Sequence, residues 1–172
     1  MDKYGHRSSD GGIDPLDVPG ASGRLWMCGK HAIGPDVDAA RRRADDAEIV
    51  VCLVERHELV GRYDGYVSWL DASSSAALWR PTPDLHVGDP EATAELVTTV
   101  GGHLGQGRNV LVHCAAGYGR TGTLAAMVLV DHGLTSTVAL ERIAAARPMA
   151  GPEAGSQLEL LRWFEDTRGG RP

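Results

Sequence analysis

A short segment around one cysteine holds the residues whose types and spacing could carry out chemistry. It reads His113-Cys114-Ala115-Ala116-Gly117-Tyr118-Gly119-Arg120-Thr121-Gly122. Its glycines and alanines allow a tight turn in which successive backbone N–H groups point inwards. Such a turn before a helix favours a bound oxyanion, and the planar guanidinium of Arg120 suits two phosphoryl oxygens. We therefore predict that residues 115–119 and Arg120 bind a phosphate group.

Cys114 is the predicted nucleophile. Backbone N–H groups, the helix dipole and Arg120 would all stabilise a thiolate at this position. A thiolate below the centre of the turn is aimed at the phosphorus of a bound phosphate monoester. The surrounding donors would also stabilise the charge of an in-line phosphoryl transfer. This chemistry needs no metal or cofactor, and the sequence offers no obvious metal site.

The elements that must position this turn alternate between strands and helices. Two continuous β-branched apolar runs, within 48–55 and 109–113, are typical of buried parallel strands. Two short apolar stretches, near 13–18 and 24–28, flank a Pro-Gly turn and predict a β-hairpin. Helices are expected after Pro35, over 58–70 despite two glycines, over about 90–104, after Gly122, over 136–146 and from Ser156. We therefore predict an α/β domain with a mostly parallel central sheet and helices on both faces.

Length and composition limit the classes of protein to be considered. The chain has 172 residues, of which 42% are hydrophobic and 23% charged, and this fits one globular domain. Its net charge of −6 argues against a general binder of nucleic acid or of anionic membranes. Three cysteines and the lack of an apolar signal segment favour a reducing cytoplasm. We expect a mobile arm at 1–12, the folded domain at 13–168 and a tail at 169–172.

The cysteine segment resembles the His-Cys-x5-Arg-Ser/Thr signature of the cysteine-dependent protein tyrosine phosphatase superfamily. Every fixed position of that signature is filled, by His113, Cys114, Arg120 and Thr121. The resemblance covers about 13–168 and is closest to the small, dual-specificity-like members of the kinase-associated-phosphatase-like branch common in bacteria. It implies the phosphotyrosine protein phosphatase fold and hydrolysis through a phosphocysteine intermediate.

The resemblance also implies a general acid and base on a proline-rich loop, about thirty positions before the nucleophile. Asp84 occupies that place, within Trp79-Arg80-Pro81-Thr82-Pro83-Asp84. Asp89 is its competitor, but the proline at position 90 makes Asp89 better explained as a helix N-cap. Asp84 is therefore the predicted proton donor.

Three further residues receive roles from the same resemblance. The hydroxyl of Thr121 would assist breakdown of the phosphocysteine, and Gln157 would help to position the attacking water. A solvated glutamine in the first turn of a helix is the alternative for Gln157. His113 is expected to orient the loop rather than to carry a proton, because a buried histidine is usually satisfied by the backbone.

The substrate is less visible in the sequence than the reaction. Lipid phosphatases of this superfamily tend to carry extra lysine or arginine beside the nucleophile, whereas Ala115, Ala116 and Tyr118 are uncharged. We therefore expect a phosphorylated protein as partner, with phosphotyrosine favoured. Phosphoserine, phosphothreonine and phosphoinositides stay open, and phosphate, sulfate and vanadate are expected inhibitors. Lys30, Arg62 and Tyr63 are either residues of the pocket rim or ordinary surface residues.

Two other functional classes are open at this point. A pseudophosphatase would bind phosphoproteins without turnover, but the presence of Cys114, Arg120 and Asp84 argues against it. A sulfur transferase would use a similar loop to hold a persulfide, but Asp84 would have no role in that chemistry. Cys52 either forms a protective disulfide with Cys114 under oxidation or is a small buried residue, and the second interpretation is favoured.

Overall fold

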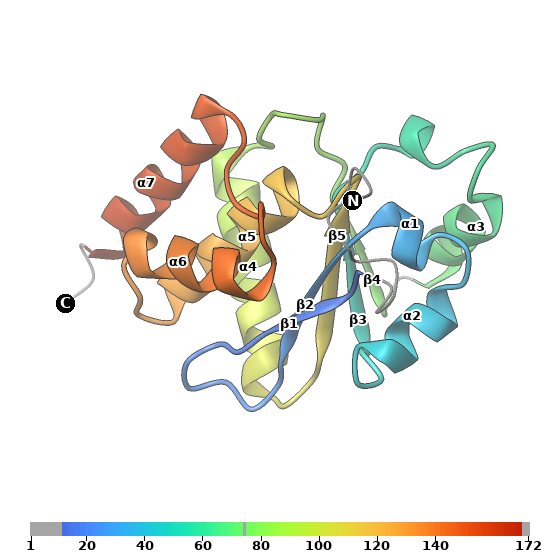
Figure 1. Cartoon of the computed structure of the whole chain (residues 1–172), viewed down its shortest axis with the longest axis horizontal. Helices are drawn as coiled ribbons and strands as arrows, with labels where there is room; N and C mark the ends of the chain where they lie inside the picture. Colours follow the sequence, from blue (N-terminus) through green and yellow to red (C-terminus); the bar gives the residue numbers. More distant parts are fainter. Residues whose placement is uncertain (1–11, 74, 170–172) are drawn as a thin grey trace.

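A five-stranded sheet runs through the centre of the computed structural model, which describes residues 12–73 and 75–169 (Figure 1). The strand order is β1-β2-β5-β3-β4. Strand β1 pairs antiparallel with β2, and the other neighbours are parallel. The strands are β1 (Asp14–Leu16), β2 (Leu25–Gly29), β3 (Ile49–Cys52), β4 (Ala77–Trp79) and β5 (Val110–Cys114).

Helices cover both faces of the sheet, so that the molecule has three layers (Figure 1). On one side lie α1 (Lys30–Ile33), α2 (Val37–Arg43) and α3 (Asp64–Ala72), with a 3-10 turn, η1 (Arg56–Glu58), before α3. On the other side lie α4 (Pro90–Gly105), α5 (Gly119–Asp131), α6 (Ser136–Ala146) and α7 (Gly155–Gly169). The predicted α/β fold with an N-terminal hairpin is confirmed.

Burial explains why β3, β5 and α5 read as continuous apolar runs. All residues of β3 and β5 are buried, because a helical layer covers each face of the sheet. Helix α5 is buried from Gly119 to Val130, since it packs between β5 and the three helices α4, α6 and α7. A helix that is apolar all round is typical of such a central position. The sheet and α5 therefore form the rigid frame on which the cysteine segment is mounted.

The sequence does not reveal two of the elements, β4 and α1. Strand β4 is only three half-buried residues long, and α1 is a single turn, so neither has a readable period. Residue Gly12 was assigned to the mobile arm, but it is buried and its carbonyl accepts a hydrogen bond from Arg147. The rest of the predicted arm, 1–11, lies outside the described residues, as do 170–172 of the predicted tail. Gly169 is the last residue of α7.

Within the described ranges, no helix is both long enough and apolar enough to cross a membrane.

Candidate active site

Cys114 is the last residue of the central strand β5, and α5 begins five residues later at Gly119. The residues between them turn back on themselves at the carboxyl end of the parallel strands, where α/β proteins commonly bind ligands. We call residues 115–119 the 115–119 loop. Cys114 is 3% exposed, so its thiol lies at the bottom of the loop rather than on the surface.

The carbonyl groups of the 115–119 loop are held from outside. The backbone N–H of Lys30 donates to the carbonyl of Ala115 at 3.0 Å, and that of Gly151 donates to the carbonyl of Tyr118 at 3.2 Å. In a trans peptide the carbonyl and the following N–H point in opposite directions. Outward carbonyls at 115–118 therefore direct the N–H groups of 116–119 towards the interior of the turn, where an anion would bind.

Arg147 supplies the strongest of these outer contacts, and the sequence analysis did not single it out. Its Nη2 donates to the carbonyl of Ala116 at 2.8 Å and its Nε to the carbonyl of Gly117 at 2.9 Å. Its Nη1 forms an ion pair with Asp14 of β1, at 2.6 Å. The Arg147 side chain is 1% exposed and that of Asp14 is 6% exposed. This buried pair therefore fixes the loop against the edge of the sheet.

Gly117 is required by the backbone path of the loop. Its φ angle is +77°, a region that residues with a Cβ rarely adopt. A Cβ at this position would also collide with the backbone carbonyl of Cys28 on β2. The loop therefore lies directly on the end of β2, and no larger residue can replace this glycine without moving it.

Arg120, in the first turn of α5, is buried and carries a second fixed ion pair. Its two terminal nitrogens donate to the two carboxylate oxygens of Glu58, at 2.7 and 3.0 Å. Its Nη1 also donates to the carbonyl of Thr82 at 2.7 Å. Glu58 could not be recognised as a site residue from its position in the sequence, because it lies in η1, far from Cys114 along the chain.

Two buried polar atoms beside the loop have no hydrogen-bond partner in the part of the chain that the structure describes. They are the Nε of Arg120 and the hydroxyl of Thr121. Buried donors are rarely left without an acceptor. An oxyanion bound in the 115–119 loop would offer an acceptor to the Nε of Arg120, and the role of Thr121 in breakdown of a phosphocysteine stays a prediction.

The ion pair between Glu58 and Arg120 lowers the pKa of the carboxyl group and raises the pKa of the guanidinium. Burial alone would raise the pKa of the Glu58 carboxyl, but hydrogen bonds from Arg120 and from the backbone of Glu55 leave it below its ordinary value. Burial would lower the pKa of Arg120, but Glu58 and the nearby Cys114 raise it overall. Both groups are therefore charged at neutral pH, and the guanidinium is fixed close to the sulfur.

His113 is fully buried below the loop and serves as its support. Its Nδ1 lies 3.2 Å from the carbonyl of Cys114, and its Nε2 lies 2.6 Å from the hydroxyl of Tyr66. A carbonyl can only accept, so the neutral ring donates from Nδ1 and accepts from Tyr66. Burial lowers the pKa of His113 to about 4. The imidazole is therefore neutral at physiological pH, as expected for an orienting residue.

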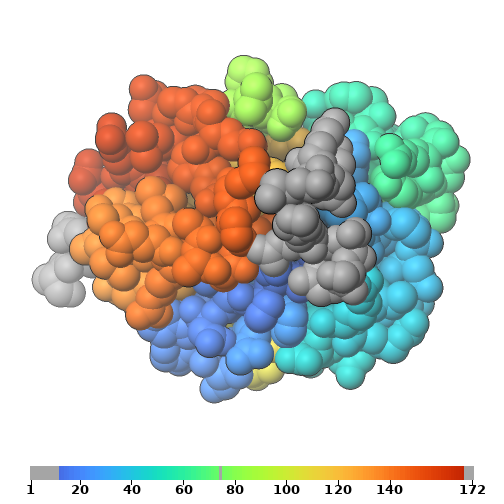
Figure 2. Space-filling model, in the orientation of Figure 1, coloured from blue at the N-terminus to red at the C-terminus, as the bar shows by residue number. Residues whose placement is uncertain are grey.

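Asp84 lies on an exposed segment, residues 80–89, that we call the 80–89 loop. One carboxylate oxygen of Asp84 is 3.3 Å from Nη2 of Arg120, and the side chain is 66% exposed. In the space-filling view this part of the chain, coloured yellow-green, stands out between the red α7 and the turquoise segment that leads into α3 (Figure 2). The structure thus brings Asp84 to the guanidinium at the mouth of the site.

Asp89 and Gln157 occupy different places from Asp84. Asp89 accepts a hydrogen bond from the backbone of Ala92 at 2.8 Å and caps α4, as predicted. Gln157 is buried in α7, where its Oε1 accepts from the backbone of Glu153 at 2.8 Å and its Nε2 donates to the carbonyl of His86 at 3.4 Å. Its amide therefore joins the start of α7 to the 80–89 loop.

The other candidates lie around this centre. Lys30 donates from Nζ to the carbonyl of Glu58 at 3.0 Å, while Arg62 and Tyr63 stack on each other beside an open groove next to α1. Burial raises the pKa of the Cys52 thiol to about 12, and the three cysteines are free. Cys52 is therefore a small buried residue in this state, and a disulfide formed under oxidation stays a prediction.

Known proteins share both the sequence and the fold of this chain. Over 68 residues it is 43% identical to human dual specificity protein phosphatase 15, a match that spans 38% of this chain and 23% of that protein. The crystal structure of Tk-PTP in the active form is 27% identical, with a TM-score of 0.66 over 86% of this chain and 97% of that one. Kinase associated phosphatase with a serine in place of its catalytic cysteine shares the fold, at 16% identity and a TM-score of 0.73 over 93% of this chain and 97% of that one. The family model described as "PTP-SAK: Swiss Army Knife protein, DSP-PTPase phosphatase domain" matches residues 36–165, and the chain therefore belongs to this family of phosphatase domains.

Proposed function

We propose that this chain hydrolyses phosphate monoesters on proteins through a phosphocysteine intermediate. One observation carries the proposal: a buried cysteine lies under a ring of inward N–H groups beside an arginine whose Nε has no partner in the described structure. Donors fixed in advance around the position of developing charge are the main source of rate enhancement in such sites. Membership in a family of dual-specificity-type phosphatase domains supports the same reaction.

The reaction has two steps. The thiolate of Cys114 attacks phosphorus, the bond from phosphorus to the leaving oxygen breaks, and Asp84 transfers a proton to that oxygen. Arg120 and the N–H groups of the 115–119 loop hold the three equatorial oxygens. Water then attacks the phosphocysteine, Asp84 takes the proton from the water, and the thiolate and inorganic phosphate are released. Each group returns to its initial protonation state without a metal ion.

The two ion pairs around the ring explain how the transition state would be stabilised. Glu58 holds the guanidinium of Arg120 from one side, so its orientation does not have to be found during the reaction. Arg147 holds the loop carbonyls from the other side. Both contacts exist before substrate binds. The donors around the loop therefore need little reorganisation as negative charge develops on the phosphoryl group in the transition state.

A phosphoprotein, with phosphotyrosine favoured, is the proposed substrate. The loop residues Ala115, Ala116 and Tyr118 add no positive charge beside Cys114. A single phosphate is neutralised by Arg120 and the loop donors, whereas a polyphosphorylated lipid headgroup would bring further negative charge that these residues leave uncompensated. Asp84 and Glu58 add negative charge at the same mouth.

The test is turnover by the wild-type chain, the Cys114→Ser variant and a matched control. We expect hydrolysis of 4-nitrophenyl phosphate and of a phosphotyrosine peptide, in the presence of a metal chelator, to fall by at least about a thousandfold in Cys114→Ser. Cys52→Ser makes the same replacement of sulfur by oxygen at another buried cysteine, and it should keep most of the activity. Turnover of a phosphoinositide above that of the peptide would overturn the proposed substrate class. Binding of the phosphopeptide with no turnover by the wild type would favour a pseudophosphatase.

A further inference from the structure

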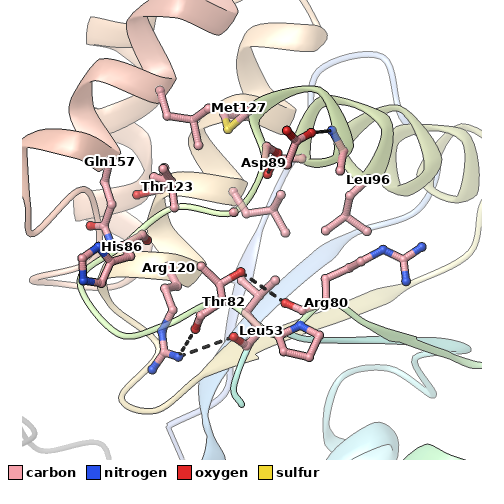
Figure 3. Close-up of a pocket in the computed structure, with 17 residues that line it drawn as sticks. Leu53, Arg80, Thr82, His86, Asp89, Leu96, Arg120, Thr123, Met127 and Gln157 are labelled. Atoms are coloured by element: carbon pink, nitrogen blue, oxygen red, sulfur yellow. Dashed lines mark hydrogen bonds between the residues drawn. The ribbon is translucent and has the colours of Figure 1, made fainter.

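A cavity of about 170 Å³ lies between the 80–89 loop and helices α4, α5 and α7 (Figure 3). Leu96 of α4 and Leu124 and Met127 of α5 form its floor, and Pro81, Thr82 and Val87 of the loop form its roof. The three floor residues are at most 5% exposed, so the floor belongs to the packed core. The cavity is thus a preformed space between a rigid base and an exposed loop.

This cavity adjoins the proposed phosphate site, and Arg120 and Gln157 border both. Neither Cys114 nor Asp84 nor any residue of the 115–119 loop lines it. Arg120 forms the wall between the two spaces, where its Nη1 donates to the carbonyls of Thr82 at 2.7 Å and Leu53 at 3.4 Å (Figure 3). The arginine that would hold the phosphoryl group is therefore hydrogen-bonded directly to the roof of the cavity.

The chemistry of the lining selects an uncharged, mainly apolar occupant. Leucine, methionine, valine and proline side chains dominate the surface, and an apolar cavity of roughly 150 Å³ is large enough to hold benzene. The guanidinium of Arg120 is already neutralised by Glu58, and Asp89 is engaged as the cap of α4. Arg80 also borders the cavity but is exposed, so a charged ligand would lose its hydration and find this counter-ion only at the solvent-exposed edge.

We propose that this cavity is a regulatory binding site for a small uncharged organic molecule, of the size of a one- or two-ring aromatic compound. Val87 of segment 83–88 packs against the core, but the polar side-chain contacts that the structure gives between this segment and the rest of the described fold are long. They are the Asp84 to Arg120 contact at 3.3 Å, the Gln157 to His86 hydrogen bond at 3.4 Å and the Ser156 to Leu85 hydrogen bond at 3.5 Å. A bound molecule adds contacts between roof and floor, and so favours the loop position in which Asp84 lies beside Arg120.

The binding test uses indole as the probe and a cavity-filling variant. A Cβ at Gly88 would lie 3.5 Å from the Thr93 hydroxyl and 3.7 Å from the Thr82 hydroxyl, at ordinary contact distance. Both threonines line the cavity, so Gly88→Leu extends a side chain into it. We expect indole to shift the NMR methyl signals of Leu96, Leu124 and Met127 in the wild type. Its binding should weaken by about tenfold or more in Gly88→Leu.

Two controls keep this test decisive. Gly102→Leu makes the same change on α4 at an exposed position with open space around it, and it should leave indole binding unchanged. Indole-3-acetate, which carries a negative charge, should bind more weakly than indole. NMR shifts confined to residues around Cys114 would overturn the site, as would equal affinity for indole in Gly88→Leu and Gly102→Leu. The shifts are measured on the wild type, so the first outcome decides the question even if Gly88→Leu proves unstable.

The regulatory effect rests on the proposed function and is measured separately from binding. The leaving oxygen of phenyl phosphate needs a proton from the enzyme. The leaving oxygen of 4-nitrophenyl phosphate needs it far less, because nitrophenolate is a stable anion. Saturating indole should raise kcat for phenyl phosphate severalfold and leave kcat for 4-nitrophenyl phosphate unchanged. The increase with phenyl phosphate should be absent in Gly88→Leu. Unchanged or lower kcat for phenyl phosphate with indole in the cavity would overturn the coupling. Absence of hydrolysis of either ester would instead overturn the proposed function, while the NMR methyl shifts would still decide the binding site.

Discussion

The 115–119 loop and the 80–89 loop meet at Arg120, but they are held in very different ways. Every outer contact of the first loop named above is a hydrogen bond of 3.2 Å or less from a buried or backbone donor. The middle of the second loop, residues 84–86, is exposed, and its polar contacts with the rest of the described fold are 3.3 to 3.5 Å long. Leu85, at its centre, even adopts a φ of +60°, which is unfavourable for a residue with a Cβ.

This difference matches the demands of the two chemical tasks. A nucleophile and an anion clamp must be fixed to fractions of an ångström, because transition-state charge is stabilised only by donors already in place. A proton donor must cover the substrate and then release the product, so its loop gains from a shallow energy surface. The molecule therefore has its tightly hydrogen-bonded loop on the buried sheet and its loosely bonded loop at the surface.

The largest effect is expected at Arg147. Arg147→Met removes the guanidinium from the buried Asp14 carboxylate and from two loop carbonyls, which should cost about 3–5 kcal/mol of the free energy of unfolding. For a chain of this size such a loss lowers Tm by about 10 °C. Hydrolysis of 4-nitrophenyl phosphate should fall with it, even at temperatures where the variant is folded by circular dichroism.

Arg142→Met is the matched control, because Arg142 is exposed on the same helix, α6. It should shift Tm by less than about 2 °C. Equal Tm values for the two variants would show that the 115–119 loop does not depend on its outer arginine.

The next largest effect is a loss of catalytic rate with no change in stability. Asp84→Asn should lower kcat for phenyl phosphate by about a hundredfold and kcat for 4-nitrophenyl phosphate much less, since only the first leaving group needs the proton. The side chain is 66% exposed, so Tm should stay the same. A pH–rate profile of both proteins with phenyl phosphate measures the change.

Asp89→Asn tests the rival aspartate. Asparagine caps a helix about as well as aspartate does, so this variant should keep both activity and Tm. If Asp89→Asn loses activity on phenyl phosphate and Asp84→Asn does not, the proton donor has been assigned to the wrong residue.

A third prediction concerns the support beneath the rigid loop and its response to pH. The pKa of His113 is lowered by burial from 6.5 to about 4 in the folded chain. Between these values the unfolded chain binds a proton that the folded chain does not. The free energy of unfolding should therefore fall as pH drops through this window, by up to about 1.4 kcal/mol per pH unit. Urea unfolding at several pH values measures this slope.

Replacement of the ring identifies the source of the slope. His113→Asn should be less stable than the wild type at pH 7, and its stability should vary less between pH 6.5 and 4. His103, whose pKa is also lowered by burial and then by Arg108, is much less buried, so His103→Asn should keep most of the slope. A wild-type slope that survives in His113→Asn would contradict a neutral buried imidazole.

The smallest effects compare two hydroxyl groups, on α5 and α7, that donate to carbonyl groups of the two loops. The hydroxyl of Thr123 donates to the carbonyl of Gly119 at 2.7 Å in a buried place, whereas that of Ser156 donates to Leu85 at 3.5 Å near the surface. Thr123→Ser keeps the first hydrogen bond, and Thr123→Val removes it at similar volume. We expect a loss of about 1 kcal/mol for Thr123→Val relative to Thr123→Ser, and less than about 0.5 kcal/mol for Ser156→Ala. Equal losses would mean that the two loops are held with similar strength.

The nucleophile, the clamp and their supporting strand could be predicted because their signals are local. Cys114 and Arg120 lie in one turn between an apolar strand and an apolar helix, and the family match confirms the resemblance that this turn carries. Asp89 could be recognised as a cap from the proline that follows it. Asp84 was selected by its distance from Cys114, and the structure brings its carboxylate to Arg120.

Glu58 and Arg147 could not be predicted in the same way, because their roles come from tertiary packing. Glu58 is one of many acidic residues in the sequence, and nothing near it shows that its carboxylate meets Arg120. Arg147 follows an alanine-rich helix and reads as an ordinary helix end. Its burial depends on Asp14, more than a hundred positions away, which itself lies in a strand of only three residues. Strand β4 could not be predicted either, since three half-buried residues are too few to show the alternation of a strand.

The strand order also has a consequence for how the protein is made. Strands β2 and β3 share no hydrogen bonds and are joined only through β5, which leaves the ribosome after both of them. A nascent chain that stops short of Val110 thus has two unconnected strand edges and no cysteine loop. Exposed edges of this kind invite wrong pairing. Completion of the sheet and formation of the 115–119 loop are therefore one event, so a half-made chain lacks the proposed active site.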